Sequence, residues 1–146
     1  MPERDLDSRN QQVIAEFRAN GGTVGGYFAG ISLLLLTTTG AKSSRPHTTP
    51  LSYLADGGRY IVFAAAGGAP ASPDWYHNLI ANPGVTVEAG TEVFEATAAV
   101  TTGEEREALF ERFAAVQPQL AVYQNRVTRQ VPVVALSGRA DRAPAP

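Results

Sequence analysis

The chain has 146 residues, a mass of 15.4 kDa and a formal net charge of −2, which fits one domain large enough to bury a core. It contains no cysteine, which excludes disulfides and thiolate metal sites, and its two histidines are too far apart in sequence to suggest a metal cluster. The slight acidic balance argues against general nucleic-acid binding, because that function needs many cations to neutralise phosphates.

The first residues, 1–5, are polar and do not resemble a secretory signal. The longest apolar run, over residues 31–36, is much shorter than the roughly 20 residues that cross a bilayer. We therefore expect a cytoplasmic protein. Weak association of the N-terminal segment with a membrane surface is an alternative, although the balanced charges of this segment disfavour binding to anionic lipid.

The first half of the chain predicts one helix and three strands. Asp7 or Ser8 can cap the helix, and Asn20 with the two glycines after it can end it. The Asp-Gly pair at Asp56 predicts a hairpin turn. In order, we expect a helix to about Ala19, a glycine-rich connector over 23–30, a central strand over 31–39, and strands over 48–54 and 59–65.

The second half predicts three helices and three strands. Ser72 and Pro73 form a good helix start, and Pro83 stops that helix. Thr102 with Glu105 fits a capping box at the start of the next helix. In order, we expect a helix to about Asn82, strands over 85–88 and 92–100 as a hairpin, a helix through Phe113, a turn or short helix from 118 to about 126, and a strand over 131–136.

This order of elements is not the strand–helix alternation of a doubly wound sheet. Five or six antiparallel strands in so short a chain most economically close into a small barrel with helices outside. The chain is therefore expected to be a mainly β fold with helices, of the α+β class. We expect an N-terminal helical segment over 1–22, a barrel domain over 23–137 and a disordered tail over 138–146.

The loop over residues 40–49 is a candidate anion site. It holds two fixed cations, Lys42 and Arg45, and no acid, so its local charge is about +2 in an otherwise acidic protein. The alternative is a solvated turn whose cations serve solubility. The remaining polar side chains of the loop are Ser43, Ser44, His47, Thr48 and Thr49.

Two further segments lie between this loop and the predicted hairpin over 85–100. The small residues over 64–70 let a flat ligand approach free backbone amides, or they simply form an ordinary strand exit. On the helix that follows, Trp75 can stack on a ring or pack in the core. His77 is expected to be a surface or structural histidine, and Asp74 favours the helix dipole.

Near the carboxyl end, Tyr123, Arg126 and Arg129 either line a pocket mouth or lie on an amphipathic surface. No nucleophilic triad, carboxylate pair or metal-ligand spacing stands out anywhere in the sequence. The chain has candidate sites for an anion and for a flat ring but no evident acid–base residues, which suggests that a cofactor carries out the chemistry.

Several strings, taken together and in this order, resemble the deazaflavin-dependent nitroreductase family, actinobacterial proteins that use coenzyme F420. The resemblance covers about residues 31–136, and its specificity comes from the number of motifs. They are Leu-Leu-Thr-Thr-Thr-Gly-x-Lys-Ser, Thr-Pro-Leu, Asp-Gly-Gly-Arg, Gly-Gly-Ala-Pro, Pro-x-Trp-Tyr-x-Asn-Leu-x-Ala-Asn-Pro-x-Val and Tyr-Gln-x-x-x-x-Arg-x-Val-Pro-Val-Val.

The resemblance implies a split β-barrel like that of the flavin-binding pyridoxine-phosphate oxidases. It also implies a site for F420 that is built from four segments. The residues are Lys42, Ser43, Arg45 and Thr48 along the cationic loop; Pro50 and Leu51 under the ring; Ala65, Ala66, Gly67 and Gly68 at the glycine turn; and Pro73, Trp75, Tyr76 and Asn78 on the short helix.

The chain also departs from the family pattern. Ala41, Ser44 and His47 stand where the family loop has Arg, Gly and Arg, which suggests a weaker hold on the polyglutamate tail of the coenzyme. Ala65 replaces a common serine. Of the positions where some members carry tyrosines on the substrate side, Ser52, Gln117 and Leu120 differ, and Tyr123 is retained.

The activity implied by the resemblance is transfer of a hydride from reduced F420 to a small planar acceptor, such as a quinone, nitroaromatic or activated alkene. Tyr123 is the candidate catalytic residue, as a donor of a hydrogen bond or proton to the acceptor. The alternatives are a non-catalytic F420 carrier and a flavin- or haem-binding split-barrel protein. Either a monomer or a homodimer is compatible with the sequence.

Overall fold

The computed structural model describes residues 3–25, 32–65, 72–128 and 130–138, with side chains in the first helix from Asn10 onward. Its elements, in chain order, are α1 (Glu3–Ala19), β1 (Leu33–Thr39), β2 (Pro46–Ser52), β3 (Leu54–Asp56), β4 (Arg59–Phe63), α2 (Asp74–Ala81), β5 (Gly84–Ala89), β6 (Glu92–Val100), α3 (Gly103–Val116), α4 (Gln119–Asn125) and β7 (Val133–Gly138).

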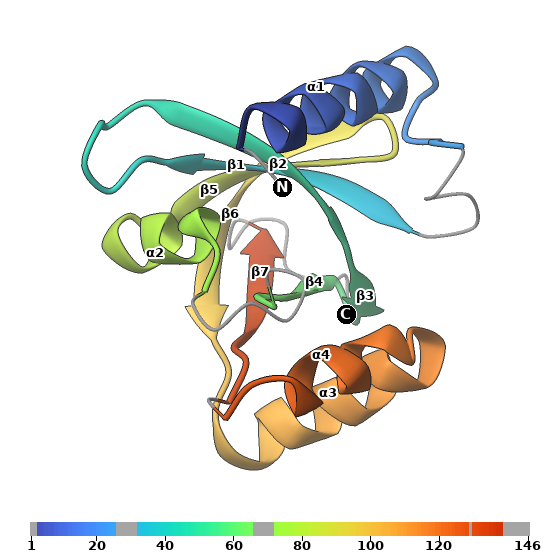
Figure 1. Cartoon of the computed structure of the whole chain (residues 1–146), viewed down its shortest axis with the longest axis vertical. Coiled ribbons are helices and arrows are strands. Elements are labelled where there is room, and N and C mark those ends of the chain that lie inside the picture. The colour runs from blue at the N-terminus through green and yellow to red at the C-terminus, as the bar shows by residue number, and fades with distance from the viewer. Residues whose placement is uncertain (1–2, 26–31, 66–71, 129, 139–146) are drawn as a thin grey trace.

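The seven strands form one antiparallel sheet in the order β2-β1-β5-β6-β7-β4-β3. The sheet curls into a half-barrel, with α1 on one side and the α3–α4 pair on the opposite side (Figure 1). The two edge strands, β2 and β3, are consecutive in the chain and are joined by Tyr53 alone. The prediction of a small antiparallel barrel with outer helices is confirmed, although it counted five or six strands.

The prediction of a single strand over 48–54 is wrong, because two strands occupy this region. β2 pairs with β1, whereas β3 pairs with β4 at the other edge of the sheet. At the crossing point, the backbone amide of Tyr53 donates to the carbonyl of Ser32 over 3.2 Å. The ring of Tyr53 meets the ring of Tyr60 edge-on, at 5.0 Å between centroids. The run is β-compatible throughout, so nothing in its composition marks the change of partner.

Two helix starts differ from the prediction, and a third agrees with it in position. α1 begins at Glu3, so Asp7 and Ser8 lie inside the helix and not at its start. α2 begins at Asp74 after Pro73, without a capping side chain. Thr102 is the N-cap of α3 as predicted, but its side chain makes no capping bond.

The other boundaries agree closely with expectation. The turn between β3 and β4 uses two glycines with positive φ, at Gly57 (53°) and Gly58 (92°), which is the backbone that an Asp-Gly hairpin needs. The strands of the second half are confirmed. β7 extends to Gly138, one residue into the predicted tail, and the rest of that tail lies outside the described residues.

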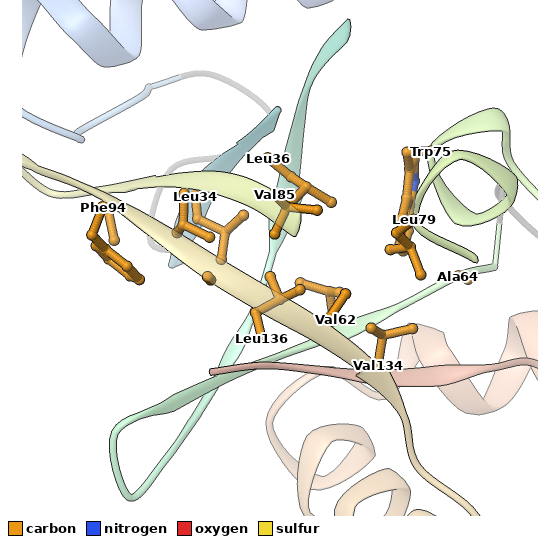
Figure 2. Close-up of a cluster of buried hydrophobic side chains, with 14 residues drawn as sticks. Leu34, Leu36, Val62, Ala64, Trp75, Leu79, Val85, Phe94, Val134 and Leu136 are labelled. Carbon is orange, nitrogen blue, oxygen red and sulfur yellow. The ribbon is translucent and has the colours of Figure 1, made fainter. Parts of the chain in front are cut away.

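The concave face of the sheet holds the main core. Trp75 and Leu79 project from α2 toward this face, where they meet side chains from the strands (Figure 2). The core includes Leu34 and Leu36 of β1, which are fully buried. α2 therefore closes one end of the half-barrel with its apolar side. The remaining buried members are Val62, Ala64, Val85, Val87, Ala89, Phe94, Ala96, Ala98, Val134 and Leu136.

Two smaller clusters cover the convex face. α1 packs Ile14 and Phe17 onto Leu33 and Leu35 of β1. α3 and α4 pack onto the outer sides of β4 and β7, in a cluster built around Phe113. Strand alternation explains this division, because successive side chains of β1 and β4 point to opposite faces of the sheet. No helix in the described part of the chain is long and apolar enough to span a membrane.

A buried arginine fixes α4 relative to the sheet. Arg106 of α3 is 4% exposed. Its Nη2 donates to the carbonyl of Val131 over 2.7 Å and to Oε1 of Gln124 over 3.0 Å, and its Nη1 pairs with Glu107. Gln124 Oε1 also accepts from the amide of Val131. One polar network thus links α3, α4 and the residue Val131, which lies just before β7.

Asp56 at the β3–β4 turn should make stability depend on pH in acid. Hydrogen bonds from Arg112 and then Arg59 lower the pKa of this carboxyl below its ordinary value. A lowered folded-state pKa stabilises the fold fully above the unfolded value of about 3.9 and loses that stabilisation as pH falls through the folded value. Asp56→Asn should cost about 1 kcal/mol of unfolding free energy at pH 7.

Urea unfolding at pH 7 and at successively lower pH checks this prediction. The difference between wild type and Asp56→Asn should shrink steadily below about pH 4, where the wild-type carboxyl begins to protonate. A difference that stays constant down to pH 2.5 would mean that the ion pairs of Asp56 do not stabilise the fold.

Candidate functional site

The loop between β1 and β2 has a defined backbone. The amide of Gly40 donates to the carbonyl of Arg45 over 2.8 Å, and the amide of Ser44 donates to the carbonyl of Gly40 over 3.0 Å. Ser44 adopts a positive φ of 60°. Ser43 Oγ accepts from the amide of Arg45 over 3.2 Å. A side chain at Gly40 would collide with Ser43 Oγ, so the turn is closely packed.

A buried asparagine of α2 anchors this loop. Asn78 is 8% exposed. Its Oδ1 accepts from the amide of Ala41 over 3.0 Å, and its Nδ2 donates to Thr38 Oγ1 over 3.1 Å. Asn82, one helical turn further, donates to the carbonyl of Thr39 over a longer 3.4 Å. α2 therefore holds the end of the β1–β2 hairpin through side-chain amides.

The two cations of the loop are exposed, and no described carboxylate pairs with either of them. Lys42 and Arg45 form no ion pair within the described part of the chain. The other arginines whose side chains are described are engaged: Arg18 with Glu88, Arg59 and Arg112 with Asp56, Arg106 with Glu107, and Arg126 over the ring of Tyr123. Two free cations on an anchored loop can receive an anion without first breaking an ion pair.

The predicted residues of β2 lie on opposite faces of the strand. Leu51 packs against the concave core, opposite Leu34. Thr48 faces the other way, and its hydroxyl bonds that of Thr37 over 2.7 Å. Pro50 pairs with Leu35, whose side chain belongs to the α1 cluster. The structure thus brings Leu51 toward α2 but directs Thr48 and Pro50 to the side that α1 covers.

The same alternation turns two further residues of β2 toward the face of Leu51. His47 and Thr49 share the face of Leu51, and His47 pairs with Thr38 across the ladder. The signal was present in the sequence, because any strand that includes Leu51 in its inward face must also turn residues 47 and 49 inward. Tyr53, which follows Ser52, also packs against the concave core.

The predicted residues around α2 are close to one another. Trp75 is 6% exposed and packs within the concave core, which is one of the two placements that the sequence allowed. Tyr76 is half-buried against the same core, with its ring 5.7 Å from that of His77. Pro73 directly precedes the helix and is half-buried.

Of the predicted glycine turn, the structure describes only its first residue. Ala65 is buried in the cluster beneath α3 and α4, whereas Ala64 faces the concave core beside Trp75. Ala66, Gly67 and Gly68 lie outside the described residues. Ala64 and Ala65, which directly follow β4, therefore belong to different clusters on opposite faces of the sheet.

Tyr123 lies on α4 and packs into the same cluster as Ala65. The guanidinium of Arg126 sits over its ring, 5.7 Å from the centroid. Nearby, Ser52 Oγ donates to Oε1 of Gln117 over 3.1 Å, which joins the end of β2 to the α3–α4 junction. Tyr123 and Trp75 thus approach β4 from opposite faces.

A groove of about 320 Å³ lies beside the base of the β1–β2 loop, between the ends of β1, β5 and β6. Threonine hydroxyls and the carboxylate of Glu95 contribute polar groups to its lining, and none of the predicted cofactor-binding residues contributes to it. Its lining is Thr37, Thr38, Thr39, Pro46, Gly84, Val85, Thr86, Glu95 and Ala96. We place the candidate site at the anchored cationic loop instead, because an acidic wall disfavours an anion.

The chain is similar to known proteins in both sequence and structure. Residues 9–137 match the family described as F420H(2)-dependent quinone reductase. An F420H(2)-dependent quinone reductase of Mycobacterium tuberculosis is 39% identical over 131 residues, which cover 86% of this chain and 87% of that protein.

Solved structures agree. An F420-H2 dependent reductase, FDR-A, is 38% identical with a TM-score of 0.68, over 73% of this chain and 94% of its own. A domain-swapped dimer is 34% identical with a TM-score of 0.70, over 93% of this chain and 100% of its own. A protein from Listeria innocua named as a pyridoxamine 5′-phosphate oxidase, 14% identical with a TM-score of 0.54 over 90% and 94%, shares the fold alone.

Proposed function

Because this chain belongs to the F420H(2)-dependent quinone reductase family, we propose that its anchored β1–β2 loop and the adjoining face of α2 hold reduced F420 for reduction of a quinone. The protein is an F420H2-dependent oxidoreductase, as the family match and the homologues show. This confirms the resemblance to the deazaflavin-dependent nitroreductases. The proposal concerns the residues that perform the reaction and the acceptor.

The side chains at the proposed site fit the chemistry of the coenzyme. Its tail carries phosphate and carboxylate groups, and the loop offers Lys42 and Arg45 without competing acids. Its flat ring needs an apolar wall, and Leu51 and Tyr76 lie partly exposed at the edge of the concave core. Trp75 supports this wall from within the core.

The remaining predicted residues receive narrower roles. Ser43 shapes the loop through its bond to the amide of Arg45, and Asn78 holds the loop in place. Thr48 and Pro50 stiffen β2 from its outer face. Ala65, with Ala66, Gly67 and Gly68 after it, is proposed to meet the polar edge of the ring through backbone amides, and Pro73 closes the site at the start of α2.

When bound, reduced F420 supplies a hydride. The protein positions the two reactants, excludes water with its apolar wall and stabilises charge on the acceptor. Tyr123 is proposed to donate a hydrogen bond or proton from its hydroxyl to an acceptor oxygen. The observation that carries the proposal is the pair of free cations on a loop fixed by a buried asparagine, beside an apolar wall.

Turnover of reduced F420 with menadione tests the proposal, and Tyr123→Phe tests its catalytic residue. We expect kcat to fall about 10-fold in this variant, because a donor to the acceptor is lost. Affinity for F420 and the melting temperature should stay within error, because the ring that packs under Arg126 is retained. An unchanged kcat would remove Tyr123 from the mechanism. Binding without any turnover would instead support a carrier.

Assembly and location remain proposals of the same kind. The solved domain-swapped dimer, at 34% identity, supports a homodimer over a monomer. We also retain weak association of α1 with a membrane surface, where quinones reside, as a prediction from the sequence. Sedimentation of the protein alone tests the homodimer, and sedimentation with vesicles tests the association with a membrane surface.

A further inference from the structure

α4 is a short helix whose position depends on contacts with the rest of the fold. It has seven residues, and no side chain caps its N-terminus. Leu120 is its one buried residue. So short a helix has little stability of its own, because nucleation is unfavourable and few bonds follow it. The placement of α4, and of Tyr123 on it, must therefore come from tertiary contacts.

The polar network around Arg106 supplies such a contact at Gln124, the residue after Tyr123. Gln124 Oε1 accepts from Arg106 Nη2 over 3.0 Å and from the amide of Val131 over 2.9 Å. The same Nη2 donates to the carbonyl of Val131 over 2.7 Å. These bonds form a closed ring between α3, α4 and a backbone position two residues before β7. One side-chain oxygen of α4 thus has two directed partners outside its own helix.

Fixing one side chain of a helix also fixes the direction of the next, because successive residues lie about 100° apart around the axis. With Gln124 turned toward Arg106, the ring of Tyr123 packs in the cluster built around Phe113. The guanidinium of Arg126 lies over this ring, 5.7 Å from its centroid. The hydroxyl is the part of Tyr123 farthest from the helix axis, so a small rotation of α4 displaces it most.

The arginine in this network is not an optimal choice for stability alone. Arg106 is 4% exposed, and its Nε has no hydrogen-bond partner among the described residues. Its guanidinium lies over the ring of Phe110, 4.8 Å from the centroid, and that ring lies 5.4 Å from the ring of Phe63 at the end of β4. A buried donor without a partner is destabilising, and an apolar side chain would avoid it. What the arginine adds is directed bonding, which favours a positioning role.

We propose that Arg106 and Gln124 are positioning residues for the reaction, which orient α4 so that the hydroxyl of Tyr123 reaches the acceptor. The inference rests on the proposed function, in which Tyr123 donates to an acceptor oxygen, and adds the residues that place this donor. Neither Arg106 nor Gln124 is assigned a contact with a reactant. A displaced donor stabilises the transition state less, so the loss should appear in kcat.

A double-mutant cycle between Gln124→Leu and Tyr123→Phe, with reduced F420 and menadione, tests the proposal. Gln124→Leu should lower kcat about 3- to 10-fold and change KM for menadione and affinity for F420 less than about twofold. The upper limit is the loss expected for Tyr123→Phe, because Gln124 acts through that hydroxyl. In the Tyr123→Phe background, Gln124→Leu should therefore lower kcat less than about twofold.

Two conservative variants test the geometry of the network. Gln124→Glu keeps an acceptor oxygen for Arg106 and should hold kcat within about twofold of wild type. Arg106→Lys keeps the charge but loses the planar fork that bonds both Gln124 and Val131, so it should lower kcat and show the same coupling to Tyr123.

Thr101→Val is the matched control for a loss of stability alone. Thr101 is 6% exposed, and its Oγ1 donates to the carbonyl of Val133 over 2.8 Å, a bond that does not involve α4. Thr101→Val and Gln124→Leu should each lower the melting temperature by about 3 °C. Only Gln124→Leu should lower kcat.

Equal losses of kcat from Gln124→Leu in the presence and absence of the Tyr123 hydroxyl would overturn the inference. So would an unchanged kcat in Gln124→Leu, or a loss of kcat in Thr101→Val as large as that in Gln124→Leu. These results leave the proposed function intact. If Tyr123→Phe itself leaves kcat unchanged, the catalytic role of Tyr123 fails and the inference fails with it.

Discussion

Replacing Lys42 and Arg45 together by glutamate is expected to weaken F420 binding at least about 100-fold while changing the melting temperature by less than about 2 °C. The loss corresponds to about 2.7 kcal/mol, or roughly 1.4 kcal/mol for each reversed charge facing an anionic tail. Stability should hardly change, because both side chains are exposed and neither forms an ion pair within the described residues.

Arg112→Glu is the matched control for this double variant. Arg112 is also an exposed arginine, but it pairs with Asp56 at 2.6 Å, far from the loop in the fold. Reversing it places two carboxylates together and should lower the melting temperature without altering F420 affinity. Parallel losses of affinity and melting temperature in the Lys42 and Arg45 variant would instead identify the loop as an ordinary solvated turn.

Asn78→Ala is expected to destabilise the protein by about 2 kcal/mol and to weaken F420 binding about 10-fold. The truncation leaves the amide of Ala41 without its acceptor and leaves Thr38 Oγ1, on a residue that is 1% exposed, without its donor. Each unpaired buried polar group costs about 1–3 kcal/mol. The released loop must also be ordered again when the ligand binds, which lowers affinity.

Asn82→Ala shows whether these effects come from the anchor itself. Asn82 makes one longer bond, 3.4 Å, to the carbonyl of Thr39 and belongs to the same helix. Its removal should cost less than about 1 kcal/mol and leave affinity within twofold. For both variants, urea unfolding gives the change in unfolding free energy, and F420 titration gives the change in affinity. Similar losses in Asn78→Ala and Asn82→Ala would contradict a specific role for Asn78.

Most elements were predictable because their signals are local. The Asp-Gly turn before β4, the alternation in β5 and β6, and Pro83 after α2 each specify a boundary through backbone chemistry. The split at Tyr53 was not predictable in this way. Whether a β-compatible residue continues one ladder or crosses to another depends on partners far along the chain, here Ser32 and the strand of Tyr60.

In the candidate site, too, local features were predictable from the sequence and long-range contacts were not. A loop with Lys42 and Arg45 and no acid is visible in sequence, whereas its anchoring by Asn78 requires α2 to pack beside β1. The role of Asn78 was inferred only through resemblance. His47 was recognised as a polar residue of the loop, but the direction of its side chain was not predicted, because the strand was predicted to start after it. The packing of Trp75 in the core was one of its two predicted placements, and the structure confirms it.

Fluorescence titration of the purified wild-type protein with F420 shows whether this loop binds the coenzyme. We expect saturable binding with a Kd on the order of micromolar, and no binding at the same concentrations when Lys42 and Arg45 are both glutamate. A wild type that shows no binding, or a double variant that binds as wild type does, would contradict the assignment of the coenzyme to this loop.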